Sequence, residues 1–216
     1  MVIIMLEMKI KDFSIEKRLV GCEYLGAGAS KEAYLDKEKN VVIKVPRGRS
    51  IIAGSGIGFD LEYPDNINDL DKMLENISQG WQEECLVWPL GQFATEIIVW
   101  NALQELREEG WDISNFAEIK DYYLDKSGVI VIEQEAATEY VFCDELDELE
   151  KYHLQYLLLE LEERYNIALR DIRTENAGKN EDGIIKIFDY GISTTTSLDD
   201  YGSYSEYSYN EDDEEY

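Results

Sequence analysis

The sequence predicts an α+β fold in two lobes, and three features of its residue pattern support this. Strand-like runs separated by turn residues occupy the segment from Glu16 to Val45. A helical pattern then precedes two further β-rich runs, and a second long helical pattern precedes a polar loop and a last short strand. Strands and helices segregated along the chain in this way are typical of α+β architecture.

The first strands are expected between Glu16 and Val45. There "KRLVGCEYLGAG" leads through a glycine turn into "SKEAYLD", and the charged turn "DKEKN" separates this run from "VVIKV". Two β-rich runs joined by such a turn are typical of a hairpin. The opening "MVIIML" is interpreted as an edge strand, because it is too short for a signal sequence and no cleavage-like pattern follows it.

The middle of the chain is expected to hold an insertion, a helix and two strands. Residues 47–80 are irregular, with a short amphipathic helix around "INDLDKMLENI". "GQFATEIIVWNALQELREEG" predicts a helix that ends at Gly110, and "FAEIKDYYLDKSGVIVIEQEA" predicts two strands joined by "LDKSG". The expected buried face of the helix comprises Phe93, Ile97, Trp100, Leu103 and Leu106.

The last part of the chain is expected to hold a long helix, a strand and a tail. "DELDELEKYHLQYLLLELEERYN" predicts the helix, and "GIIKIFDYG" contains the strand. The end, "SLDDYGSYSEYSYNEDDEEY", is acidic, tyrosine-rich and of low complexity. The expected apolar positions of the helix are Leu146, Leu149, Leu154, Leu157, Leu158 and Leu161.

The charge of the chain limits its partners. With 47 acidic and 20 basic residues the net charge is −27, which repels nucleic acid and anionic membranes and favours cations and basic proteins. An ATP site in this chain would therefore need local positive groups and bound metal. The three cysteines are widely spaced and form no CxxC pair, which favours a reduced, cytoplasmic protein without zinc.

Two features suggest a phosphate site, and each has an ordinary alternative. Gly26 and Gly28 lie between strands, where their backbone N–H groups could approach phosphates or simply form a hairpin turn. Lys44 lies within "VVIKV", where it either faces water from an edge strand or meets an anionic partner. Glu96, near the start of the first long helix, is a candidate partner, although such a residue usually faces solvent.

Three polar side chains after the second long helix suggest phosphoryl transfer. Asp171 could accept a proton from an attacking hydroxyl, and Asn176 and Asp189 could supply oxygen ligands to Mg²⁺. Each element alone has an ordinary interpretation, as a helix-capping loop or as a strand followed by a turn. Their combination across the predicted "NEDG" hairpin favours the functional one.

Together these motifs resemble the protein-kinase-like superfamily. "LGAGASKEAY" is similar to the glycine-rich loop, "VVIK" to the lysine motif and "FATEIIVW" to the glutamate-bearing helix. "LRDIRTEN" is similar to the catalytic loop HRDxxxxN, and "DYG" to DFG. The elements keep the family's order over residues 20–195.

The resemblance implies a division of the chain into lobes. It implies an antiparallel β-sheet N-lobe over residues 1–136, with the insertion at about 47–80. It also implies a minimal, truncated C-lobe over residues 137–197, followed by the acidic tail at 198–216. The compact size and acidic composition would fit a phage or bacterial origin.

The resemblance also implies a role for each site residue. Lys44 would hold ATP phosphates with Glu96 as its anchor, under a phosphate cover formed by Gly26 and Gly28. Asp171 would be the catalytic base.

The remaining implied positions are the metal ligands, one basic residue and the hinge. Asn176 and Asp189 would bind Mg²⁺, and Arg173 replaces a lysine that contacts the γ-phosphate. "IEQEA", with Glu133 and Glu135, would be the hinge that holds adenine by its backbone.

Several positions depart from the family pattern. The third glycine of the loop is missing, with Ser30 or Lys31 in its place, and Leu169 replaces the usual histidine. No APE-like motif follows "DYG". These departures put recognition of a protein substrate in doubt.

The expected function is transfer of the ATP γ-phosphate, with Mg²⁺, to a Ser, Thr or Tyr hydroxyl of a protein. The tail tyrosines could be autophosphorylation targets, but a disordered, solubilising tail is the favoured interpretation. One alternative is a pseudokinase-type acidic protein that sequesters or inhibits a basic partner. Another is a small-molecule kinase, which ranks lower because "RDIRTEN" departs from the HGDxHxxN loop of antibiotic and sugar kinases.

Overall fold

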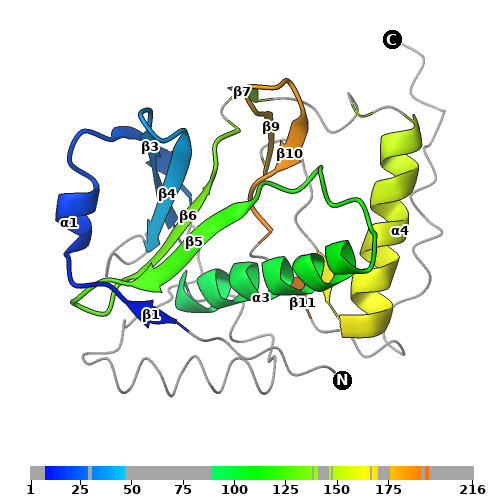
Figure 1. Cartoon of the computed structure of the whole chain (residues 1–216), viewed down its shortest axis with the longest axis horizontal. Helices are drawn as coiled ribbons and strands as arrows, with labels where there is room; N and C mark the ends of the chain where they lie inside the picture. Colours follow the sequence, from blue (N-terminus) through cyan, green and yellow to red (C-terminus); the bar gives the residue numbers. More distant parts are fainter. Residues whose placement is uncertain are drawn as a thin grey trace, which may run out of the picture.

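The largest sheet of the described residues has six strands, and the predicted α+β class is confirmed in a computed structural model (Figure 1). The predicted short helix in the insertion and the tyrosine-rich tail lie outside the described residues. The described residues are 8–28, 31–46, 89–137, 139–140, 146, 148–165, 167–169, 176–190 and 193–194.

The large sheet has the order β1-β5-β6-β4-β3-β2, in which only β1 is parallel to its neighbour. Two smaller sheets have the orders β10-β9-β7 and β11-β8. The strands are β1 (Lys9–Ile10), β2 (Glu23–Ala27), β3 (Lys31–Asp36), β4 (Val41–Pro46), β5 (Ile119–Leu124), β6 (Ile130–Glu135), β7 (Glu139–Tyr140), β8 (Ala168–Leu169), β9 (Ala177–Lys179), β10 (Ile185–Ile187) and β11 (Ser193–Thr194). The described helices are α1 (Ile15–Arg18), α3 (Pro89–Glu108) and α4 (Glu148–Tyr165).

The hairpin of β3 and β4 sets which side chains share a face of the sheet. Its turn has Asn40 in the left-handed region, with φ 52°. The register pairs Ala33 with Lys44 and Lys31 with Pro46. Because side chains alternate along strands, Lys31 and Lys44 project from the same face as diagonal neighbours.

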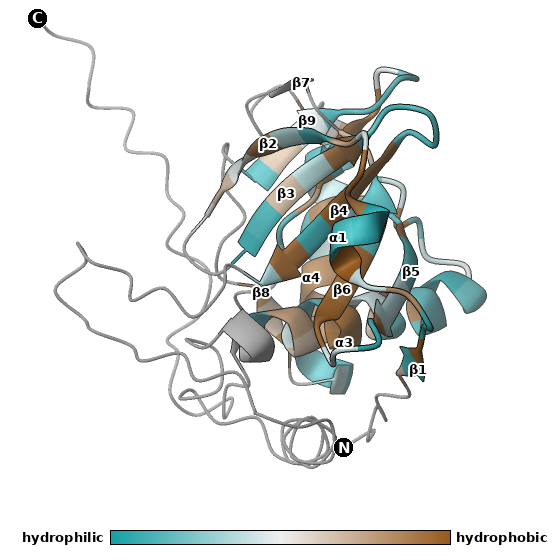
Figure 2. Cartoon of the chain, turned by 90° about the vertical axis from the view of Figure 1, so that its left-hand side faces the viewer, coloured by the Kyte–Doolittle hydropathy of each residue, from teal (hydrophilic) through white to brown (hydrophobic). Residues whose placement is uncertain are grey.

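Helix α3 packs across one face of this sheet and forms most of the core (Figure 1). All five residues of its predicted apolar face are buried, and burial extends around the helix to Ala94, Ile98 and Val99. In its described residues, the first half of α3 is therefore buried around its whole circumference, whereas the second half exposes polar residues such as Glu108. Figure 2 shows the brown, apolar parts of β4 and β6 beside it.

Gly110 ends α3, as predicted. Its φ is 101°, and its N–H donates to Arg107 O at 2.9 Å while Trp111 N–H donates to Leu106 O at 3.1 Å. This pair of hydrogen bonds is a Schellman motif, whose left-handed position favours glycine.

Helix α4 packs against the end of α3 and continues the core. Leu157 and Leu161 are buried as predicted, but Leu149 is 63% exposed and so the prediction for it is wrong. Leu146 is buried but precedes the helix. The apolar clusters of the described residues therefore do not include Leu149.

The strand predicted from Glu16 onward is wrong at its start, because α1 occupies these residues. The helix is held at both ends by distant partners. Asp125 Oδ2 accepts a hydrogen bond from Ile15 N–H at 2.9 Å, 110 residues away in the sequence. At the other end Arg18 Nε donates to Glu133 Oε1 at 2.8 Å, 115 residues away. These contacts stabilise a short helix that local sequence does not specify.

One apolar cluster joins α3, the sheet, α4 and the C-terminal strands, so residues on both sides of the predicted lobe boundary share a core. The opening stretch "MVIIML", predicted as an edge strand, lies outside the described residues; within them, β1 is the strand at one edge of the large sheet. Among the described residues, no helix combines the length and apolar content needed to cross a membrane.

Asp125 is expected to be a stability determinant of the β5–β6 turn and of α1. It is fully buried and accepts from the N–H groups of Ile15, Ser127 and Val129. Asp125→Ala should lower the free energy of unfolding by about 1–3 kcal/mol, because buried donors lose their acceptor. Chemical denaturation would measure this, with Asp182→Ala, in an exposed turn, as the control.

The effect of Asp125 should depend on pH. Burial raises the pKa of Asp125, but the hydrogen bonds from Ser127, Val129 and Ile15 outweigh it and bring the pKa below the ordinary 3.8. Its stabilisation is therefore present above pH 3.8 and is lost as pH falls through the lower pKa of the folded state. An equal difference between wild type and Asp125→Ala above and below this window would contradict the assignment.

Candidate functional site

Two lysines and two carboxylates from β3, β4, α3 and the segment after β10 meet at one place. We call it the lysine–carboxylate cluster: Lys31, Lys44, Glu96 and Asp189. Lys44 Nζ donates to Glu96 Oε1, and Lys31 Nζ donates to Glu96 Oε2 at 2.6 Å. Lys31 Nζ also donates to Asp189 Oδ1 at 2.7 Å. Glu96 therefore bridges two ammonium groups, one at each oxygen.

The strand register and α3 account for this meeting. Lys31 and Lys44 project from the sheet face on which α3 packs, and α3 carries Glu96 beneath them. Glu96 is fully buried, and the two lysines are 6% and 5% exposed. Both ordinary alternatives, a lysine facing water from an edge strand and a solvent-facing glutamate, are therefore excluded.

The segment around Asp189 is anchored on both sides. Lys44 Nζ also donates to the carbonyl oxygen of Phe188, and Phe188 N–H donates to Asn176 O at 2.9 Å. On the other side Tyr190 is buried, and its hydroxyl donates to Ala117 O at 3.0 Å. These contacts hold the Asp189 backbone while its side chain remains 37% exposed.

The two lysines differ in their electrostatics. Burial lowers the pKa of Lys44, the bond to Glu96 offsets only part of this, and Lys31 adds a further lowering. Burial also acts on Lys31, but Asp189 and Glu96 outweigh it, so the pKa of Lys31 is raised. The difference is that Lys31 donates a hydrogen bond to Asp189 as well as to Glu96, whereas Asp189 acts on Lys44 only through its charge.

Asn176 and Asp189, the predicted metal ligands, lie at the same end of the β9–β10 hairpin. The hydrogen bond between Asn176 and Phe188 places the two residues on adjacent chain segments. Both can offer oxygen ligands, which suit Mg²⁺. The donor types of Asn176 and Asp189 therefore suit the predicted metal, while in this structure Asp189 pairs with the ammonium of Lys31.

Gly26 and Gly28 lie at the turn end of β2. Gly28 N–H donates to Lys31 O at 2.8 Å, which ties the turn to the first residue of β3. Gly26 has φ 155°, at the point where the register of β2 against β3 shifts. A side chain is disfavoured at that φ, so the backbone requires Gly26 more than Gly28.

The predicted hinge residues take part in a polar network. Arg18 pairs with Glu133, and Tyr123 donates to Glu133 Oε1 at 2.9 Å. Burial raises the pKa of Glu133, but these hydrogen bonds outweigh it and lower the pKa. Glu135 accepts from Asn180 at 2.8 Å. Both side chains therefore stabilise the scaffold, and backbone contact with adenine stays a prediction.

Asp171 and Arg173 lie outside the described residues, so their predicted roles stay predictions. The residue that sequence reasoning missed is Lys31, which appeared only as a replacement for the third glycine. The sequence did contain a signal for it: counting residues back from the β3–β4 turn places Lys31 on the same face of the sheet as Lys44. Its contacts with Glu96 and Asp189 could not be predicted, because these residues are distant in the sequence.

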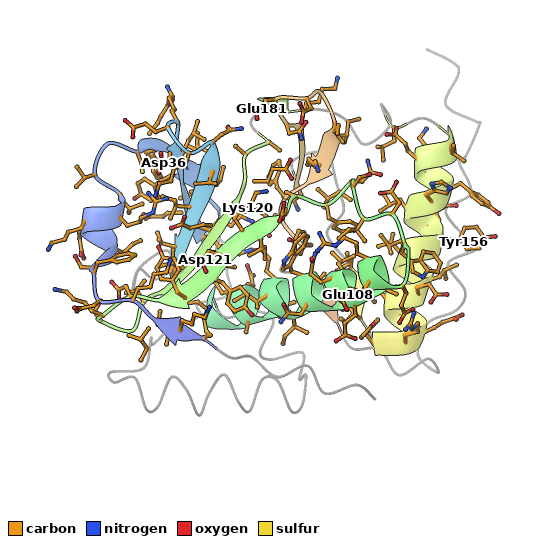
Figure 3. All side chains as sticks on the ribbon, in the orientation of Figure 1. Asp36, Glu108, Lys120, Asp121, Tyr156 and Glu181 are labelled. Carbon is orange, nitrogen blue, oxygen red and sulfur yellow. The ribbon has the colours of Figure 1, made fainter. Side chains whose placement is uncertain are left out.

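A separate hollow of about 440 Å³ lies between the end of α3 and α4. Its lining shares no residue with the lysine–carboxylate cluster. It includes Trp111, Tyr152, His153 and Tyr156, and Figure 3 shows Tyr156 on the outer side of α4.

A scan of protein-family models found no match to this chain, and a search of curated proteins returned none either.

Proposed function

We propose that this protein is a protein-kinase-like phosphotransferase that moves the γ-phosphate of ATP to a Ser, Thr or Tyr hydroxyl with Mg²⁺. The observation that carries the proposal is the buried Lys44–Glu96 pair beside Asp189. An ion pair of this kind, next to a metal-binding aspartate, is required in protein kinases to hold and orient the phosphates. Lys44 and Glu96 are 52 residues apart, so their contact is a tertiary one.

The proposal assigns each residue a physical task. Lys44 donates to phosphate oxygens, and Glu96 fixes the position of that ammonium. Asp189 and Asn176 would hold the metal, and when bound Mg²⁺ neutralises charge that develops on the transferred phosphoryl group. Asp171 would orient the acceptor hydroxyl and take its proton.

The charge of the chain also bears on the proposal. A net charge of −27 disfavours the approach of a polyanion, so a nucleotide site needs concentrated positive charge. The two buried ammonium groups of the cluster are candidate phosphate donors, although Glu96 and Asp189 balance their charge within the described residues. The strand order likewise supports a kinase-like N-lobe, because β4, which carries Lys44, is an interior strand between β6 and β3. The two-lobe arrangement and a cytoplasmic location remain parts of the proposal.

A second candidate function is a kinase-like binding protein that sequesters a basic partner, which the charge of −27 favours. The two candidates differ in what they need from the cluster. A binding protein that acts through its acidic surface should keep its function when Asp171 alone is neutralised. A phosphotransferase should lose it.

The test of the proposal is nucleotide-dependent stability. Mg·ATP at about 100 times its Kd should stabilise the wild-type protein by about 2.7 kcal/mol, which a rise in the melting temperature would report. Asp189→Ala should abolish this rise, because it removes a predicted metal ligand. Asp182→Ala, in the exposed β9–β10 turn, should keep it.

Absence of any shift in the wild-type protein at saturating Mg·ATP would remove the nucleotide-binding proposal. An undiminished shift in Asp189→Ala would leave nucleotide binding in place but would exclude Asp189 as a metal ligand.

A further inference from the structure

Lys31 occupies a position where the resemblance implies a glycine, yet it is one of the most constrained side chains in the cluster. Its ammonium contacts Glu96 at 2.6 Å and Asp189 at 2.7 Å, and its side chain is 7% exposed. A solvated surface lysine would need neither contact. The side chain is therefore held in the site by two carboxylates from distant parts of the chain.

Burying two ammonium groups around one carboxylate is unfavourable without further negative charge. Each ammonium loses hydration, and the two repel each other across Glu96. Within the described residues, the cluster contains two cations and two carboxylates, so it is neutral overall. Asp189 thus supplies the second negative charge that balances Lys31.

The two contacts of Lys31 differ in how easily they can be exchanged. Glu96 is fully buried, so its bond to Lys31 is shielded from water. The Asp189 side chain is 37% exposed, so its bond is partly screened and open to competing ions. Lys31 also follows the glycine turn, and its backbone carbonyl oxygen accepts a hydrogen bond from Gly28 N–H. The ammonium is therefore anchored at Glu96 and exchangeable at Asp189.

We propose that Lys31 is a second phosphate-binding lysine, which neutralises Asp189 in the protein without nucleotide and donates to a nucleotide phosphate oxygen when nucleotide is bound. This inference rests on the proposed function. An ammonium group has three donors, so Lys31 can retain Glu96 while it exchanges a carboxylate oxygen for a phosphate oxygen.

Two consequences follow from this exchange. Lys31 should contribute to affinity only for nucleotides that carry a polyphosphate, because it acts on phosphate charge. Its ammonium and a divalent cation should also compete for the same carboxylate, so Lys31 should raise the Mg²⁺ concentration needed at Asp189.

The experiment measures binding of ATP, ADP and adenosine by calorimetry, and titrates Mg²⁺ separately in the absence of nucleotide, where Lys31 still occupies Asp189. Lys31→Met keeps the length of the buried stem without its charge. We expect it to bind ATP and ADP about 10- to 100-fold more weakly, from the loss of a charge-assisted hydrogen bond. Adenosine should bind as to wild type, and the Mg²⁺ midpoint should fall.

Lys37→Met is the matched control, because Lys37 lies in the β3–β4 turn and is 71% exposed beside Glu23. It should change none of these values. If Lys31→Met does not fold, Lys31→Gln carries the same expectation, since its amide can still donate to Glu96 without bringing charge.

The outcomes separate this inference from the proposed function. Failure of the wild-type protein to bind ATP would remove the proposed function itself. Wild-type binding of ATP with unchanged affinity in the Lys31 variant would overturn the role of Lys31 alone. An equal loss for ATP and adenosine would also overturn it, because that pattern indicates a structural role without phosphate contact.

Discussion

Replacing Glu96 with glutamine is expected to lower the free energy of unfolding by about 3–5 kcal/mol, because it leaves buried ammonium groups without their shared anion. Glu96 accepts at both oxygens, from Lys44 and from Lys31. Glutamine offers one acceptor oxygen and one NH₂ group, which cannot accept from an ammonium. Chemical denaturation of wild type and Glu96→Gln would measure the loss.

The control is Glu108→Gln, since Glu108 is exposed on the same helix (Figure 3). It should leave stability within about 0.5 kcal/mol of wild type. The double variant Lys31→Met/Glu96→Gln should recover part of the loss, because one of the two uncompensated ammonium groups is removed. Equal stability of Glu96→Gln and Glu108→Gln would show that the cluster contributes nothing to folding.

Replacing Asp171 with alanine is expected to slow γ-phosphate transfer by about 10²- to 10⁴-fold, the usual contribution of a general base. Nucleotide binding should stay as in wild type, because Asp171 is proposed to orient the acceptor and to hold no metal. Incorporation of radiolabelled phosphate from ATP, with the protein alone and with added protein acceptors, would measure the transfer. The Mg·ATP melting shift would measure the binding.

Asp189→Ala is the comparison for this variant, because it should lose binding and transfer together. Wild-type labelling in Asp171→Ala would point to a contaminating kinase or to different chemistry. Loss of the melting shift in Asp171→Ala would assign that residue to nucleotide binding and exclude a role confined to the acceptor.

The elements with strong local signals could be predicted from the sequence. Helix α3 follows from the periodicity of its apolar residues, and its end follows from Gly110, which takes a left-handed conformation. The β3–β4 and β9–β10 hairpins follow from short polar turns between apolar runs. In each case the physical cause lies within a few residues of the element, so a single sequence contains it.

The predictions that were wrong concern features that depend on contacts between distant parts of the chain. Helix α1 forms where a strand was expected, because Asp125 and Glu133 bind its two ends. Leu149 is exposed because the apolar clusters of the described residues do not reach it. Neither cause is visible in the local pattern, since each depends on where another part of the chain packs.

For the candidate site, the sequence by itself determined which residue types could hold a phosphate and a metal, and in what order they occur. Only the tertiary structure decided that Lys44 meets Glu96, and that Lys31 joins them from the position of an expected glycine. The physical reason is the cost of burying a charge: an ammonium group removed from water is stable only where the fold brings a carboxylate to it. That meeting depends on the packing of α3 against the sheet, which no local pattern encodes.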